Sequence, residues 1–199
     1  MAIDFEFSRF EIPLKELPSG ETLQLNVFRM VSAIPGPFVH IQANIHGAEI
    51  QGNAVIYQLM SYFKNHPFRG TLQFIPQCNP MALNHKEGTH TLGRFSPVTG
   101  DNWNRNYADL SHKSFEEIAF DFKTFTQSHT SASWDHIKKD FKHHLQMAAE
   151  KIIQNTMPYR LADHKLLALK LQSLAAPADI VLDLHTGPVA TRYLYAAEY

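Results

Sequence analysis

The chain has 199 residues, of which 44% are hydrophobic and 19% charged, a balance that predicts one folded domain with a sizeable core and excludes a disordered or fibrous protein. Its 18 basic and 19 acidic residues give a formal net charge of −1, so no strong field favours nucleic acid or an anionic membrane as a partner. A single cysteine, an amino terminus unlike a signal peptide and the lack of a long apolar run predict a cytoplasmic protein.

The first half of the chain predicts strands around one helix. Residues 21–31 alternate apolar and polar side chains, as in an antiparallel or edge strand. After a turn at 34–37 (IPGP), residues 38–45 form a second strand, which we expect to pair with the first as a hairpin. Residues 49–63 have helical spacing, and residues 71–77 form a short β-rich run. Strand, helix and strand in this order predict a βαβ unit with parallel pairing, which places sites at the carboxyl ends of strands.

The second half predicts a long polar loop, helices and a final strand. A loop as long as residues 78–110 is typical of a functional segment. Residues 114–117 (SFEE) form a capping box, which predicts the start of a helix. An amphipathic packing helix over 134–152 and a Leu-rich helix over 160–175 follow. The continuous apolar run at 179–184 (DIVLDL) predicts a strand buried on both faces.

Two of the 12 histidines directly follow predicted strands. Residues 45–49 read IHGAE, in which Gly47 allows a tight bend and His46 and Glu49 can converge on one metal ion. Hydrolytic zinc takes three protein ligands and keeps one open position, and His185, after the last predicted strand, is the best third candidate. The alternative is that both histidines bond to the backbone and that Glu49 is an ordinary first-turn acid.

The polar loop carries a second motif, NWNRNY at residues 102–107. In it, adjacent Asn104 and Arg105 offer an amide donor and a planar guanidinium fork, a pair that suits a substrate carboxylate. A solvated stretch of loop is the alternative for both residues.

Taken in order, IHGAE, NWNRNY and LDLH (residues 182–185) resemble the zinc carboxypeptidase superfamily, and most closely its succinylglutamate desuccinylase/aspartoacylase branch. The resemblance runs from about residue 38 to residue 199 and implies an α/β fold of the phosphorylase/hydrolase-like type, a mixed β-sheet flanked by helices. We expect residues 1–199 to form a single domain. The resemblance implies one zinc ion per chain, bound by His46, Glu49 and His185. It also implies that Asn104 and Arg105 hold a substrate carboxylate and that Arg94 polarises the scissile carbonyl.

The sequence departs from the family pattern in the support of a ligand histidine. The family usually shows D-x-N-R, whereas this chain has Asn102 at the first position, preceded by Asp101. An Asn carbonyl can accept the same hydrogen bond but brings no negative charge. Asp183, two residues before His185, is another candidate support.

A second departure concerns the general base. Family members carry a glutamate well beyond the third ligand, and in this chain Glu198 comes too soon for that role. We therefore expect the 199 residues to be the amino-terminal portion of a longer catalytic domain. The expected activity is zinc-dependent hydrolysis of an amide bond in a small molecule or peptide with a free carboxylate, by an N-acyl amino acid deacylase or a metallocarboxypeptidase. The alternative is a metal-binding domain that is catalytically silent.

A second group of candidate ligands lies in the amphipathic helix. His136, Asp140 and His144 recur every four residues and so share one helix face, which could bind an adventitious metal ion. A solvated polar face is the favoured interpretation, and whether a second metal binds stays open.

Overall fold

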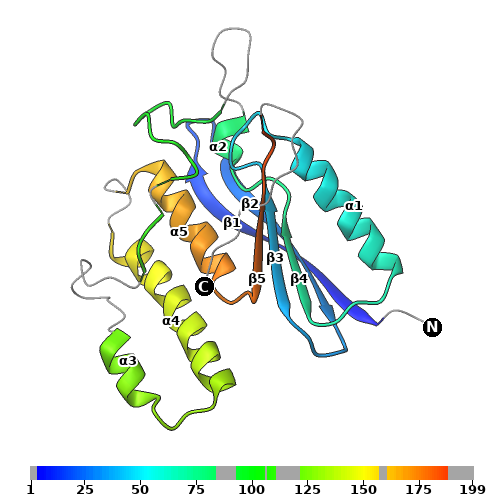
Figure 1. Ribbon diagram of the computed structural model, residues 1–199. Coiled ribbons are helices and arrows are strands. Elements are labelled where there is room, and N and C mark those ends of the chain that lie inside the picture. The colour runs from blue at the N-terminus through cyan, green and yellow to red at the C-terminus, as the bar shows by residue number, and fades with distance from the viewer. Residues whose placement is uncertain (1–3, 84–92, 106, 111–121, 157–160, 188–199) are drawn as a thin grey trace.

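The computed structural model describes residues 4–83, 93–105, 107–110, 122–156 and 161–187. These residues form a five-stranded sheet in the order β1-β2-β4-β3-β5 (Figure 1). The strands are β1 (Phe5–Glu16), β2 (Thr22–Ser32), β3 (Phe38–Ala43), β4 (Thr71–Ile75) and β5 (Ile180–Leu184). β3 runs parallel to β4 and β5, while β2 is antiparallel to β1 and β4. The sheet is therefore mixed, as predicted.

Helices cover both faces of this sheet (Figure 1). The described helices are α1 (Gln51–Asn65), α2 (Pro80–Leu83), α3 (Phe122–Ser128), α4 (Trp134–Asn155) and α5 (Asp163–Ala175). α1 covers one face and α5 the other, while α4 packs on α5 and α3 lies away from the sheet (Figure 1). α1 connects parallel β3 and β4, which confirms the predicted βαβ unit. The capping box at 114–117 lies outside the described residues. None of the described helices is long and apolar enough to cross a membrane.

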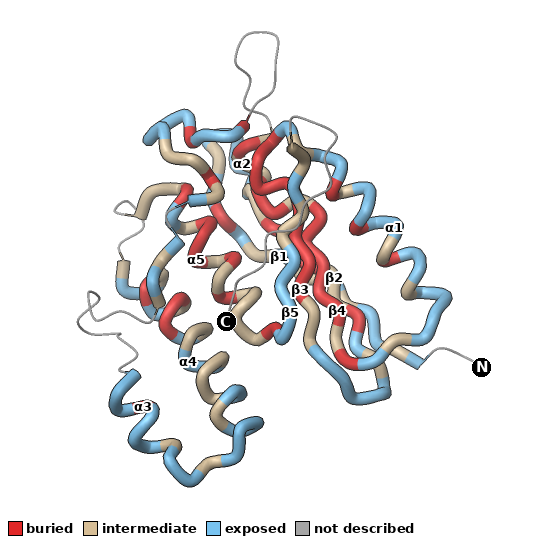
Figure 2. Tube along the Cα trace, viewed as in Figure 1, coloured by how far each residue is buried: buried red, intermediate tan, exposed pale blue. Residues whose placement is uncertain are grey.

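The core has one apolar layer on each face of the sheet. The layer under α1 contains Met30, Ile41, Ile56 and Phe74, and the layer under α5 contains Leu25, Val27, Ile75, Leu167 and Leu171. Figure 2 shows the buried residues concentrated along the central strands and the sheet-facing sides of the helices. α4 packs on α5 through Ala149, Ile152 and Leu169. The central parallel strands β3 and β4 thus contain mostly buried residues.

The predicted hairpin between residues 21–31 and 38–45 is wrong. β2 pairs with β1 and β4, and β4 separates it from β3. The partner β1 escaped the sequence analysis because its apolar alternation changes phase after Phe7, resuming at Phe10, and because Pro13 argues against a strand. β1 accommodates Pro13 at the sheet edge, where its register with β2 shifts between Pro13 and Lys15.

Two burial predictions are also wrong. β5 was expected to be buried on both faces, but Ile180 and Val181 are 47% and 51% exposed, because β5 pairs only with β3 among the described strands and ends the sheet. The predicted packing helix is buried only in its second half, where Ala149 and Ile152 lie against α5, whereas Trp134 is 75% exposed. The first turns of α4 extend away from the sheet (Figure 2).

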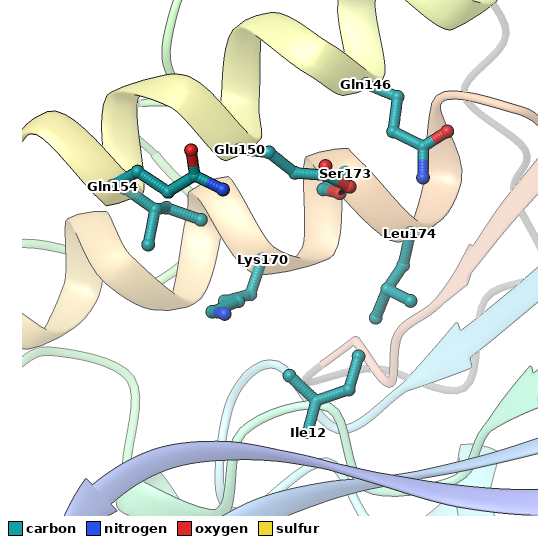
Figure 3. Close-up of a pocket in the computed structure, with 8 residues that line it drawn as sticks. Ile12, Gln146, Glu150, Gln154, Lys170, Ser173 and Leu174 are labelled. Carbon is teal, nitrogen blue, oxygen red and sulfur yellow. Dashed lines mark hydrogen bonds between the residues drawn. The ribbon is translucent and has the colours of Figure 1, made fainter.

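The layer between β1, α4 and α5 contains a cavity of about 300 Å³ (Figure 3). Ile12 lines it from β1, and Glu150 and Lys170 line it from the two helices. Glu150 Oε1 accepts a hydrogen bond from the Ser173 hydroxyl at 3.0 Å. None of the metal ligands or substrate-binding residues predicted from the sequence lines this cavity.

Candidate metal centre

The segment that carries His46 begins with a left-handed turn. Asn44, directly after β3, has φ 66°, a conformation that Asn tolerates better than most residues. Its side-chain Nδ2 donates to the carbonyl of His46 at 2.8 Å and to that of Gly47 at 3.2 Å. Asn44 therefore fixes the path of the chain from β3 towards α1 and aims His46. The sequence analysis missed this residue.

Gly47 lies in the predicted turn, at a position with no space for a side chain. A Cβ atom at this position would lie 2.1 Å from the carbonyl oxygen of Ala82, and the N–H of Gly47 donates to the carbonyl of Gly93 at 2.9 Å. The chain does turn here, since the N–H of Glu49 donates to the carbonyl of His46 at 3.1 Å, but Gly47 is not among the described glycines with positive φ. Close packing at Gly47 brings the segment from Gly93 onward beside His46.

Two histidines face one carboxylate. His46 Nδ1 lies 2.9 Å from Glu49 Oε1, and His185 Nδ1 lies 2.8 Å from Glu49 Oε2. One ligand atom from each of the three residues lies within 4.8 Å of the others. Two imidazole nitrogens and a carboxylate form a donor set that catalytic zinc uses, with one further position for water or substrate. The residues present therefore fit a single zinc ion.

The outer nitrogens of both rings have oxygen partners. With a proton on Nε2, His46 donates to Asn102 Oδ1 at 3.0 Å and His185 donates to Asp183 Oδ2 at 2.9 Å. A metal ion would displace the Nδ1 protons that bond to Glu49 here, and these partners would then hold each ring with Nδ1 directed at the ion. The same Asn102 oxygen accepts the backbone N–H of Asn104 at 2.9 Å. Asn102 thus joins His46 to the loop that carries the predicted substrate-binding residues.

The electrostatics of the centre favour a bound cation. Burial opposes ionisation of Glu49, but hydrogen bonds from His185, His46 and the Thr186 N–H outweigh it and hold the pKa of the Glu49 carboxyl well below its ordinary value. Hydrogen bonds to Asp183 and Glu49 raise the pKa of His185 to about 9, so a metal ion that binds at neutral pH would displace a proton from this ring. Glu49 is therefore ionised across the neutral pH range, as a metal ligand must be.

The predicted carboxylate-binding pair lies next to His185. Asn104 Nδ2 is 3.1 Å from His185 Nε2, and Asn104 Oδ1 accepts a hydrogen bond from the Tyr107 hydroxyl at 2.7 Å. Arg105 Nη1 donates to the carbonyl of Asn104 at 2.6 Å, and the Arg105 side chain is exposed. An amide and a guanidinium therefore border the centre on its solvent side.

Of the other predicted site residues, Arg94 lies beside Glu49, whereas Asp101 lies beside α5. Arg94 Nη1 lies 3.8 Å from Glu49 Oε1, and its side chain is 51% exposed, so the guanidinium borders the centre. Asp101 Oδ2 lies 3.4 Å from Nε2 of His164, a buried residue of α5. This contact ties the loop to α5, whereas the side chain that meets His46 is that of Asn102.

Residues 35–199 match the succinylglutamate desuccinylase/aspartoacylase catalytic domain. The chain belongs to this family. A succinylglutamate desuccinylase/aspartoacylase family structure from Shewanella amazonensis is 42% identical, with a TM-score of 0.81 over 91% of this chain and 47% of its own. The corresponding structure from Shewanella frigidimarina is 35% identical, with a TM-score of 0.81 over 92% of this chain and 46% of its own. The resemblance in the three motifs and the expected fold are confirmed.

Other comparisons add less. A succinylglutamate desuccinylase/aspartoacylase structure from Rhodobacter sphaeroides is 18% identical with a TM-score of 0.52, which shows a shared fold alone. No curated protein matches the chain significantly. The chain spans less than half the length of the two Shewanella family members, 47% and 46%.

Within the family fold, three contributors to the site were missed from sequence. The Asn44 side chain holds the turn that carries His46, and the backbone N–H of Thr186 donates to Glu49. The Tyr107 hydroxyl donates to Asn104. Thr186 directly follows the motif LDLH, and Tyr107 is the last residue of the motif NWNRNY. Motif proximity is the signal that could have found these two, and the enrichment of Asn in left-handed turns could have found Asn44.

Proposed function

We propose that the chain is part of a zinc-dependent hydrolase that cleaves an amide bond in an acylated amino acid with a free carboxylate. The observation that carries this proposal is the convergence of His46 Nδ1 and His185 Nδ1, within 2.9 Å, on the carboxylate of Glu49. Membership of the desuccinylase/aspartoacylase family supports an N-acyl amino acid deacylase over a metallocarboxypeptidase.

His46, Glu49 and His185 would hold the zinc ion, which supplies Lewis-acid polarisation of the scissile carbonyl and an activated water molecule. The ionised Glu49 provides the negative charge of the ligand set. Asn102 and Asp183 accept the Nε2 protons of the two histidines and so would keep both Nδ1 atoms directed at the ion once it displaces their protons.

The remaining polar groups bind and orient the substrate. Arg105 and Asn104 would grip the substrate carboxylate, since a guanidinium fork and an amide donor match its two oxygens. Arg94, at the border of the centre, would donate to the carbonyl oxygen as negative charge develops on it. Hydrolysis also needs a proton acceptor, and we propose that a glutamate outside the described residues serves as this base.

A substrate panel tests the proposal. The protein that contains this chain, loaded with zinc, is expected to release free amino acid from N-succinyl or N-acetyl amino acids and to leave peptide carboxyl termini intact. Hydrolysis of the peptides alone would favour a carboxypeptidase. Zinc-loaded protein that cleaves neither class would refute the hydrolase and support the silent metal-binding domain.

Replacement of Arg105 tests the carboxylate grip separately. Arg105→Ala is expected to leave zinc content unchanged and to raise KM about 10- to 100-fold with a smaller change in kcat, because it removes uniform binding of the substrate carboxylate. Arg9→Ala, on β1 and far from the centre, is the matched control. An unchanged KM in steady-state kinetics would remove Arg105 from the substrate site.

A further inference from the structure

A second group of metal-binding side chains lies where α3 meets α4. His129 follows the last residue of α3, while His136 and Asp140 lie in the first turns of α4. His129 Nε2 is 3.0 Å from Asp140 Oδ2, and His136 Nε2 is 3.9 Å from the same oxygen. One ligand atom of each residue lies within 4.8 Å of the others. None of these three residues belongs to the centre formed by His46, Glu49 and His185.

The position of His129 is fixed by its other nitrogen. His129 Nδ1 lies 2.7 Å from the carbonyl oxygen of Phe125, to which it donates, and its ring stacks on that of Phe125 with centroids 4.0 Å apart. A histidine held in this way by a backbone carbonyl presents Nε2 as the metal-binding atom, the arrangement typical of metal ligands. Here that atom faces Asp140.

His136 and Asp140 are four residues apart on one helix, so their side chains occupy the same face one turn apart. The sequence analysis grouped them with His144. In the structure, His144 turns its Nδ1 to the backbone carbonyl of Asp140 at 2.8 Å, and His129, from the other helix, completes the group. The nearby ammonium groups of Lys138 and Lys142 pair with Asp179, which leaves the Asp140 carboxylate facing the imidazoles.

We propose that His129, His136 and Asp140 bind a second divalent cation, of the zinc class, that links the end of α3 to the start of α4. Neighbouring ligand atoms in a tetrahedral zinc site lie about 3.3 Å apart, given bonds of about 2.0–2.1 Å, and the observed 3.0 and 3.9 Å bracket this spacing. The ion takes the place of the proton shared between His129 Nε2 and Asp140, which passes to solvent. Its role is structural, since α3 and the exposed start of α4 have little core to hold them together.

Zinc titration in a non-coordinating buffer tests this site. In a His46→Ala background, which disables the first centre, calorimetry is expected to detect one zinc ion per chain. Adding His136→Ala or Asp140→Asn should weaken that binding at least about ten-fold, since loss of a ligand exceeds loss of its support. His143→Ala, an exposed histidine on the same helix, is the matched control and should bind zinc unchanged.

Thermal unfolding gives an independent readout. Zinc should raise the Tm of the His46→Ala protein, and this rise should disappear with His136→Ala. If His46→Ala does not fold, the same difference is read from the total zinc stoichiometry of the native chain and its His136→Ala variant. The proposal is overturned if no second equivalent of zinc binds, or if it binds equally well after both His136→Ala and Asp140→Asn.

Discussion

The two histidine clusters contain the same ligand types in opposite settings. His46, Glu49 and His185 join segments 136 residues apart, and His46 is 4% exposed. His129, His136 and Asp140 are close in sequence, and the His136 and Asp140 side chains are 58% and 37% exposed. The first cluster depends on the sheet being assembled, whereas the second needs only a turn between two helices.

The difference in burial between Glu49 and Asp140 predicts which of the two clusters binds a cation more tightly. In the first cluster the side chain of Glu49 is 12% exposed and receives hydrogen bonds from two rings and a backbone N–H. A buried carboxylate needs a positive partner. The protonated His185 is that partner in this structure, and a divalent cation would take its place, so we expect tight binding there. Asp140 is solvated, and its interaction with a cation is screened by water. We therefore expect the first centre to retain zinc through purification and the second to load only when zinc is added.

The largest expected effect comes from His46→Ala, which removes one of the three proposed ligands of the first centre. Zinc affinity there should fall more than about 100-fold, beyond the 10- to 100-fold cost of losing a supporting partner. Elemental analysis of protein purified without added metal should fall from about one zinc per chain to nearly none. His143→Ala is the control. Full zinc occupancy in His46→Ala would refute the assignment of the first centre.

A smaller effect is expected at Asn102, whose oxygen accepts a hydrogen bond from His46 Nε2 at 3.0 Å. Asn102→Ala should weaken zinc binding about 10-fold or more, while Asn102→Asp should strengthen it, because a carboxylate increases the basicity of the ring. Competition with a chelator measures both changes, and Asn26→Ala on β2 is the control. Equal zinc affinities in the native, Asn102→Ala and Asn102→Asp proteins would show that Asn102 does not affect zinc binding.

The smallest effect concerns the link between the two regions. Asp179, directly before β5, accepts hydrogen bonds from Lys138 at 2.6 Å and Lys142 at 2.5 Å on α4, and from the N–H of Phe38 at 2.8 Å. Asp179→Asn should lower the free energy of unfolding by about 1 kcal/mol at pH 7, a charged hydrogen bond discounted for solvent screening. Zinc binding at both centres should stay unchanged.

The pH dependence of this effect has a definite sign. Burial opposes ionisation of Asp179, but the two lysines outweigh it and hold the pKa of its carboxyl below the ordinary value. The carboxylate therefore stabilises the fold fully above the unfolded pKa of about 4, and the contribution is lost as pH falls towards the lowered folded value. Urea unfolding at pH 7 and pH 3 should show the gap between native and Asp179→Asn protein narrowing at the lower pH. A constant gap would contradict the ion pairs.

Much of the site could be predicted because its signals are local. His46 and Glu49 share one short motif, His185 follows an apolar strand, and the order of strand, helix and strand indicated an α/β domain. The second cluster shows the limit of this approach. Helical spacing found His136 and Asp140, but it offered His144 as the third member, since nothing in the spacing reveals which side chain a neighbouring helix contributes.

The sequence by itself determined the local periods, the strand and helix types of the central βαβ unit and the candidate ligands that follow β3 and β5. These depend on the torsions and side-chain directions of neighbouring residues. Only the tertiary structure decided that β2 pairs with β1 and β4, that β5 lies at an edge of the described sheet, and that Gly47 packs on Ala82. Such features arise from contacts between distant segments, whose free energy depends on the packing of the whole domain rather than on any local pattern.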